Sequence, residues 1–111
     1  MIDALRGKVI HYLELIGDPG KTLEIGAFDV NGGVSDLFTD YLGTDMRAGK
    51  GVDMVIDAHD LLDKFTLHSF DTIVWLEAME HDDSFWITMD NITSLIKTDG
   101  HVMISGPTIS F

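Results

Sequence analysis

Five short apolar runs recur along this chain, and most are separated by segments long enough for a helix or a crossover. Short apolar runs that break at glycine or at an acidic residue are typical of strands buried on both faces of a sheet. Strands that alternate with helices pair in parallel, and right-handed crossovers leave few strand orders. The pattern predicts an α/β fold, a doubly wound parallel sheet of five strands in order 3-2-1-4-5 with helices on both faces. The expected strands are residues 22–25, 41–44, 52–56, 71–76 and 101–105.

Helical spacing appears between these runs. Apolar residues three or four positions apart predict a helix within residues 1–16, on the face formed by Ile2, Leu5, Val9, Leu13 and Ile16. A second such face runs from Phe85 to Ile96, preceded by possible N-cap residues at 82–84. We expect a short helix at 32–39, a short helix or turn at 60–66, and turns at 17–20 and 97–100. The whole forms one predicted domain over 1–111, with an N-terminal helix in 1–20 and a core over 21–107.

Composition excludes several classes of protein. The chain has 111 residues, no Cys, and 19 acidic against 7 basic side chains, for a formal net charge of −12. Without Cys there is no disulfide scaffold, zinc ribbon or Cys nucleophile. The negative charge argues against binding to nucleic acid or to an anionic membrane, because phosphates require clustered Lys and Arg. No apolar stretch approaches the roughly 18 residues of a membrane span, and we expect a cytoplasmic protein.

Acidic residues and glycines stand where the expected strands end. Ligands of open α/β sheets bind at these carboxyl ends. Glu24 lies near the end of the first strand and Gly26 directly follows that strand. Asp45 follows the second strand, at the spacing of an acidic residue that accepts hydrogen bonds from both hydroxyls of a ribose. Position 28 is Phe and position 31 is Asn, which excludes the G-x-G-x-x-G fingerprint of dinucleotide-binding proteins, and a P-loop is absent too.

The carboxylate of Glu24 indicates the charge of the ligand. Beside the first glycine it would repel a diphosphate and attract an ammonium group. A ribonucleoside with a cationic amino-acid tail fits Glu24 and Asp45 together. S-adenosyl-L-methionine is such a ligand, and the sequence predicts it as the cofactor.

Four segments in register resemble class I S-adenosylmethionine-dependent methyltransferases, in particular the group often called type 11, whose fold is Rossmann-like. LEIGAFDVNGG at 23–33 is similar to the first motif of that family, and YLGTDMRAGKGVDMVIDAHDL at 41–61 to its second and third strands. SFDTIVWLEAMEHD at 69–82 resembles the fourth strand, and LIKTDGHVMISGP at 95–107 the turn and fifth strand, with Thr98-Asp99 in place of Pro-Gly. The resemblance covers residues 21–107.

The resemblance implies a cofactor-binding role for ten residues. Glu24 would face the methionine amino group, and Gly26 would allow the loop to approach the sulfonium ligand. Those expected at the methionine and methyl end are Glu24, Gly26, Ala27, Asn31, Leu76 and Glu77. At the other end, Asp45 would hold the ribose hydroxyls and Met46 would cover one face of adenine. Asp57 would accept from the adenine amino group, and the Ala58 backbone N–H would donate to the ring. The alternative role for Asp57, less favoured, is a cap for the short helix or turn at 60–66.

His81 is the candidate catalytic residue that the sequence offers. Its neighbours Glu80 and Asp82 stabilise an imidazolium, which opposes a role as a base near neutral pH. We therefore expect His81 to position an acceptor rather than to deprotonate it. The pairs His59-Asp60 and His81-Asp82 also contain metal-ligand types, but both follow strands of an α/β fold, and no metal is expected.

The resemblance implies a methyltransferase acting on a small-molecule acceptor. Two alternatives stay open: a non-catalytic module that binds the cofactor or a partner, and a nicotinamide-dependent Rossmann oxidoreductase, which the missing fingerprint disfavours. The chain ends soon after the expected fifth strand, so the domain is expected to be incomplete in comparison with the family. A homodimer could cover the sheet edge that this leaves exposed.

Overall fold

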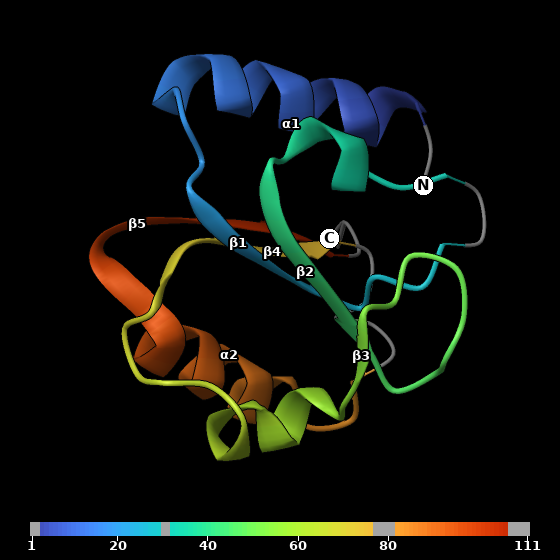
Figure 1. The fold of residues 1–111 in the computed structure, drawn as a ribbon, viewed down its shortest axis with the longest axis vertical. Coiled ribbons are helices and arrows are strands. Elements are labelled where there is room, and N and C mark those ends of the chain that lie inside the picture. Colours follow the sequence, from blue (N-terminus) through green and yellow to red (C-terminus); the bar gives the residue numbers. More distant parts are fainter. Residues whose placement is uncertain (1–2, 30–31, 77–81, 107–111) are drawn as a thin grey trace, which may run out of the picture.

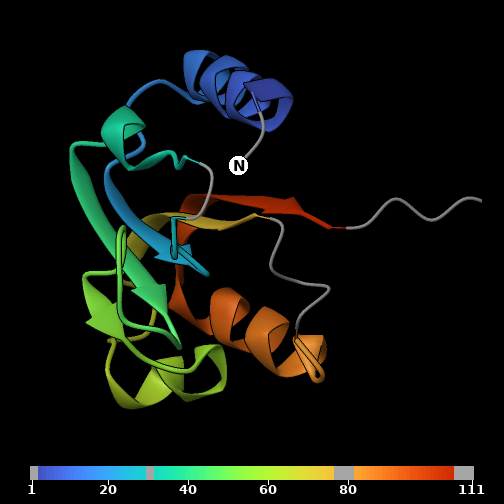
Figure 2. The ribbon, with the colours of Figure 1, turned by 90° about the vertical axis from the view of Figure 1, so that its right-hand side faces the viewer.

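The computed structural model describes residues 3–29, 32–76 and 82–106 and contains one five-stranded sheet, shown edge-on in Figure 2. The strand order is β3-β2-β1-β4-β5, and every neighbouring pair is parallel. The predicted strand order is therefore confirmed. The strands are β1 (Lys21–Ile25), β2 (Asp40–Asp45), β3 (Met54–Val55), β4 (Phe70–Leu76) and β5 (Ile96–Ser105).

Helical segments cover both faces of the sheet, as predicted. Helix α1 (Asp3–Ile16) and the 3₁₀ turn η1 (Ser35–Leu37) lie on one face, and helix α2 (Phe85–Leu95) and the 3₁₀ helix η2 (Ala58–Asp63) lie on the other (Figure 1). None of the helices in the described ranges combines the length and the hydrophobicity that a membrane span requires.

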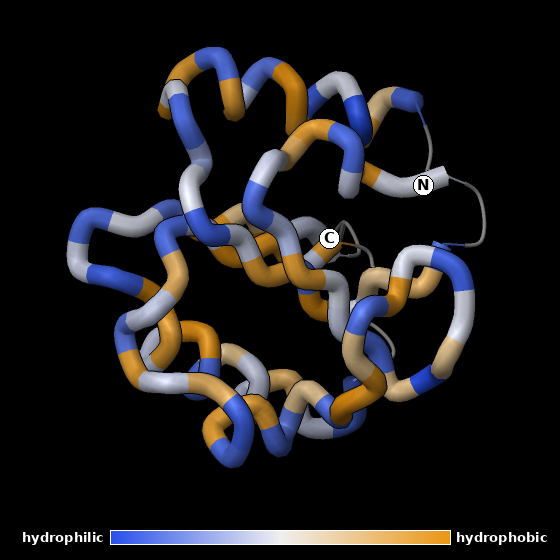
Figure 3. Tube along the Cα trace, in the orientation of Figure 1, coloured by the Kyte–Doolittle hydropathy of each residue, from blue (hydrophilic) through white to orange (hydrophobic). Residues whose placement is uncertain are grey.

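Alternation along the strands divides the core into two apolar clusters. Leu23, Ile25, Ile73 and Trp75 point toward α2 and η2, because successive side chains of a strand face opposite sides. Val74 and its neighbours on the other face pack with α1 and η1. Hydrophobic stretches accordingly run through the central strands, whereas the outer loops are hydrophilic (Figure 3).

Several predicted boundaries are wrong. The helix expected at 32–39 is only the three-residue turn η1, and the strand expected at 52–56 pairs with β2 only at Met54–Val55. The segment expected at 60–66 begins earlier, at Ala58, because the Asp57 carboxylate caps it by accepting from the His59 backbone N–H at 2.9 Å.

The turn expected at 97–100 is also wrong, because this segment belongs to β5. Between two paired positions, β4 advances from Phe70 to Thr72 while β5 advances from Ile96 to His101. The polar segment is therefore accommodated as an irregularity of the ladder. A Cβ on Gly100 would lie 2.7 Å from the Ile96 side chain, so the close approach requires glycine there.

Candidate functional site

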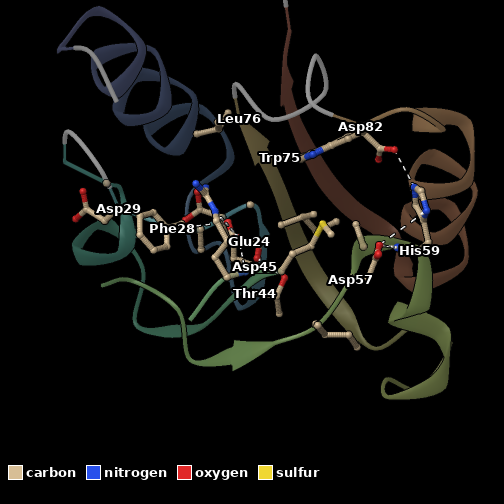
Figure 4. A pocket seen from close by; sticks show the side chains of 18 of the residues that line it. Glu24, Phe28, Asp29, Thr44, Asp45, Asp57, His59, Trp75, Leu76 and Asp82 are labelled. Carbon is tan, nitrogen blue, oxygen red and sulfur yellow. Dashed lines mark hydrogen bonds and ion pairs between the residues drawn. The ribbon is translucent and has the colours of Figure 1, made fainter. Parts of the chain in front are cut away.

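A cavity of about 770 Å³ opens at the carboxyl ends of the central strands, the edge at which ligands of open α/β sheets bind (Figure 4). Its volume lies within the range of roughly 300–1,000 Å³ that is usual for small-molecule and cofactor sites. Glu24, Phe28 and Asp45 lie on one side of the view, and Asp57 and His59 lie on the other. The cavity is the candidate functional site.

The loop after β1 forms part of the lining and turns sharply at its first glycine. Gly26 has φ of 75°, a left-handed conformation that glycine adopts without strain. The backbone N–H groups of Gly26 and Ala27 both donate to the Thr44 carbonyl at 2.9 Å. This turn holds the loop against the end of β2, so that Glu24 and Asp45 line the same cavity.

Asp45 joins the loop after β1 to the loop after β2. Its carboxylate accepts from the Phe28 backbone N–H at 3.1 Å and from the Arg47 backbone N–H at 2.9 Å. The Arg47 guanidinium lies 4.3 Å from the centre of the Phe28 ring, and its Nε is 3.3 Å from the same carboxylate. The Asp29 backbone N–H donates to the Lys50 carbonyl at 2.8 Å. Two loops far apart in sequence thus form one wall.

Glu24, which the sequence predicts to face the methionine amino group of the cofactor, carries a buried carboxyl group. Only 5% of the residue is exposed, and its carboxylate accepts a hydrogen bond from the Tyr41 hydroxyl. Burial raises the pKa of Glu24 to about 7, although the Tyr41 hydrogen bond opposes this change. The nearby carboxylates of Asp29 and Asp45 raise the pKa further. Burial and the Glu24 carboxylate in turn raise the pKa of Tyr41 well above its usual value.

The opposite wall contains an ionic hydrogen bond between η2 and the residues before α2. His59 Nε2 lies 2.8 Å from Asp82, and this hydrogen bond raises the pKa of His59. Burial alone would raise the pKa of Asp82, but hydrogen bonds from Thr88, His59 and the Ser84 backbone outweigh it and lower that pKa. Ser84 occupies the N-cap position of α2 without a side-chain cap, and its backbone N–H donates to the Asp82 carboxylate at 2.9 Å.

The structure brings most of the predicted cofactor residues to one cavity. Those that line it are Glu24, Gly26, Ala27, Asp45, Met46, Asp57, Ala58 and Leu76. Asn31, Glu77 and the catalytic candidate His81 lie outside the described residues. Within the described ranges, no group of three or more His, Asp or Glu residues has a geometry that could hold a metal ion.

Phe28, Arg47 and Trp75 are among the lining residues that the sequence did not predict for the cofactor site. Arg47 lies two positions after Asp45, and this spacing was the available signal for its hydrogen bond. The alternation of β4 places Trp75 on the face of Ile73, but the sequence does not say that a cavity reaches its ring.

Solved structures share this fold. A SAM (S-adenosylmethionine) dependent methyltransferase from Archaeoglobus fulgidus is similar with a TM-score of 0.78 and 18% identity, over 96% of this chain and 53% of that chain. The trans-methyltransferase CalH, crystallised in complex with SAH (S-adenosylhomocysteine), is similar with a TM-score of 0.61 and 15% identity, over 86% of this chain and 34% of CalH. This chain thus spans about half of the first protein and about a third of the second. No protein-family model matches the sequence, and the curated proteins contain no significant match. The fold is that of a class I, Rossmann-like methyltransferase.

Proposed function

We propose that this chain binds S-adenosylmethionine and acts as the cofactor-binding part of a methyltransferase for a small-molecule acceptor. The observation that carries the proposal is the placement of two carboxylates in one cavity of suitable volume. Glu24 is buried on the α1 face of the sheet, and Asp45 stands at the end of β2. An ammonium group and a ribose are the ligand parts that these two carboxylates suit.

The ligand would lie along the carboxyl ends of the strands. Its ammonium group would approach Glu24, and this interaction favours the ionised carboxylate. Asp45 already accepts hydrogen bonds from Phe28 and Arg47, but a carboxylate has about four lone-pair sites and keeps room for a ribose hydroxyl. Asp57 and Ala58 line the far end, where an adenine amino group would find a carboxylate acceptor.

Methyl transfer demands little covalent chemistry of the protein. The cofactor, when bound, supplies an activated methyl group, and the protein contributes by positioning donor and acceptor. Leu76, at the end of β4, lines the cavity beside Glu24 and is our candidate for a residue next to the methyl group. His81 remains our candidate for a residue that positions the acceptor.

Calorimetric titration with S-adenosylmethionine, S-adenosylhomocysteine and NAD tests the cofactor. We expect both adenosyl ligands to bind with one site per chain and NAD to give no heat of binding. Saturable binding of NAD alone would replace the proposal with the nicotinamide-dependent alternative.

A second candidate function is a module that binds the cofactor without turnover. It rests on the same two carboxylates of the lining, Glu24 and Asp45, which suit a bound cofactor whether or not a methyl group is transferred. Release of S-adenosylhomocysteine in the presence of a library of small nucleophiles separates the two candidates. Binding without release for any acceptor would support the module and contradict the enzyme.

For partners, we propose a second copy of the chain. Among the described strands, β5 pairs only with β4, and its other edge offers backbone groups that a strand of a second copy could satisfy. Sedimentation equilibrium should then give the mass of a dimer, and a monomer mass would contradict the proposal.

We propose the cytoplasm as the location, since a chain without Cys gains nothing from an oxidising compartment. Cell fractionation tests it.

A further inference from the structure

Trp75 is a buried residue whose indole N–H has no hydrogen-bond acceptor among the residues that the structure describes. It stands near the end of β4 with 1% of its surface exposed, and it lines the cavity. In Figure 4 it lies between the side that carries Glu24 and the side that carries His59. Within the described ranges, Trp75 donates no side-chain hydrogen bond, whereas the polar side chains around it are hydrogen-bonded.

A buried indole N–H normally has an acceptor, because an unpaired donor keeps its full desolvation cost. Among the described residues, no side-chain nitrogen or oxygen is both shut off from solvent and without a partner. The unpaired N–H of Trp75 is therefore not fully shut off from open space, and the cavity is the space that the structure shows Trp75 to line. The protein thus presents a hydrogen-bond donor toward the cavity, available to an acceptor on a ligand.

The surroundings indicate which ligand atom that is. Ile25, Ile56, Ala58 and Trp75 line the cavity and belong to the apolar cluster on the α2 face. The Asp57 carboxylate also lines this cavity. The lining therefore combines apolar walls with an N–H donor at Trp75 and a carboxylate acceptor at Asp57. Adenine has the matching groups, since it is flat and apolar on its faces, its amino group donates, and its ring nitrogens accept.

We propose that Trp75 is a specificity-determining residue that donates its indole N–H to a ring nitrogen of the adenine of the cofactor. The inference deepens the proposed function and rests on it. Trp75 then donates to a ring nitrogen of the base, and Asp57 accepts from its amino group, so that the two residues recognise adenine together. A purine with a carbonyl group in place of the amino group would face the Asp57 carboxylate with a second acceptor and be rejected.

The test is a double-mutant cycle in which one change is made in the protein and the other in the ligand. Trp75→Phe keeps an aromatic ring but removes the N–H, and Trp86→Phe is the matched control, because Trp86 is 56% exposed and does not line the cavity. Each protein is titrated with S-adenosylhomocysteine and with its 1-deaza, 3-deaza and 7-deaza analogues, each of which lacks one ring nitrogen. Thermal unfolding of the three proteins checks that they fold.

We expect Trp75→Phe to weaken S-adenosylhomocysteine by about threefold to tenfold, the scale of one neutral hydrogen bond, and Trp86→Phe to leave it unchanged. One of the three analogues should bind the wild type more weakly than S-adenosylhomocysteine does, by the same factor. On Trp75→Phe that analogue should bind as tightly as S-adenosylhomocysteine does. The proposal is overturned if the loss of affinity of every analogue, relative to S-adenosylhomocysteine, is the same on both proteins. It is also overturned if no analogue binds the wild type more weakly than S-adenosylhomocysteine does. If Trp75→Phe does not fold, the indole resonance of the Trp86→Phe protein decides the matter.

A second measurement needs no change at Trp75. The chain has two Trp residues, so the Trp86→Phe protein carries a single indole N–H. Its proton resonance should move downfield when S-adenosylhomocysteine binds, and an unmoved resonance in the saturated protein would contradict the hydrogen bond. If S-adenosylhomocysteine binds none of the proteins, the proposed function itself fails, which is a distinct result.

Discussion

Replacing Glu24 by Gln should stabilise the protein at alkaline pH. Gln has nearly the same shape and keeps a carbonyl oxygen to accept from the Tyr41 hydroxyl. Burial raises the pKa of Glu24 from its ordinary 4.5 to about 7, so the folded state resists its ionisation. The difference between the two values corresponds to about 3 kcal/mol, which is the largest gain we expect from Glu24→Gln.

The sign of the pH dependence follows from proton linkage. Between pH 4.5 and about 7 the folded protein holds the Glu24 proton more tightly than the unfolded chain. The free energy of unfolding therefore falls as the pH rises through this window and levels off above it. Glu24→Gln has no such group, so its advantage over the wild type should be near zero below the window and should reach its full size above it.

Urea denaturation of both proteins across this range measures the effect. His59, whose raised pKa also makes the protein less stable as the pH rises, contributes equally to both proteins and cancels in the difference. Tyr41→Phe is the control, since it removes the hydrogen bond that lowers the pKa of Glu24, and its decline should be larger than that of the wild type and extend to higher pH. Parallel stability curves for wild type and Glu24→Gln would refute the reasoning. The same variant should bind S-adenosylhomocysteine more weakly, because the ammonium group loses its carboxylate.

Three further perturbations separate binding from folding. Asp45→Ala should weaken the affinity for S-adenosylhomocysteine by about 1–3 kcal/mol, measured by calorimetry, and unchanged affinity would contradict the ribose assignment. Gly43→Ala should destabilise the protein by about 1–3 kcal/mol in urea, because a Cβ there would meet the Gly51 carbonyl and lie 2.9 Å from the Ala27 side chain; a neutral effect would show that the loop shifts freely. His59→Gln should flatten the stability profile above pH 6.5, where the wild type loses the protonated His59 that Asp82 stabilises, and an unchanged profile would show that this ion pair contributes nothing.

The strand order was predictable because it depends on features that tertiary packing rarely overrides. A strand such as Ile73–Leu76 is a continuous apolar run because helices cover both faces of the sheet, and in β1 the apolar Leu23 and Ile25 flank the buried Glu24. Right-handed crossovers then restrict the order to few choices. The lengths of the minor elements were not predictable in this way. Polar residues 97–100 have the composition of a turn, yet they continue β5, because strand pairing resumes at His101 and carries the chain past them.

The acidic members of the site were predictable because the chain position of a strand end is visible in the sequence. Asp45 and Asp57 follow apolar runs directly, and both line the cavity. The contacts made by these carboxylates were not visible. Asp57 caps η2, and Asp82 bonds to His59 across 23 positions of the chain, a pairing that only the folded arrangement of η2 and α2 creates.

The wall built from the loops after β1 and β2 explains why the site needs its glycines. Phe28 is held between the Arg47 guanidinium and the backbone at Gly49, where a Cβ would overlap the Phe28 ring. Gly51 has φ of 86°, and a Cβ there would lie 2.6 Å from the Ala27 carbonyl. The segment at 46–51 is therefore shaped around Ala27 and Phe28, which fixes the Phe28 N–H that Asp45 accepts. The Asp45 carboxylate, which would bind the ribose, is therefore oriented by the loop at 46–51, although the sequence of this loop indicates no more than a connection between two strands.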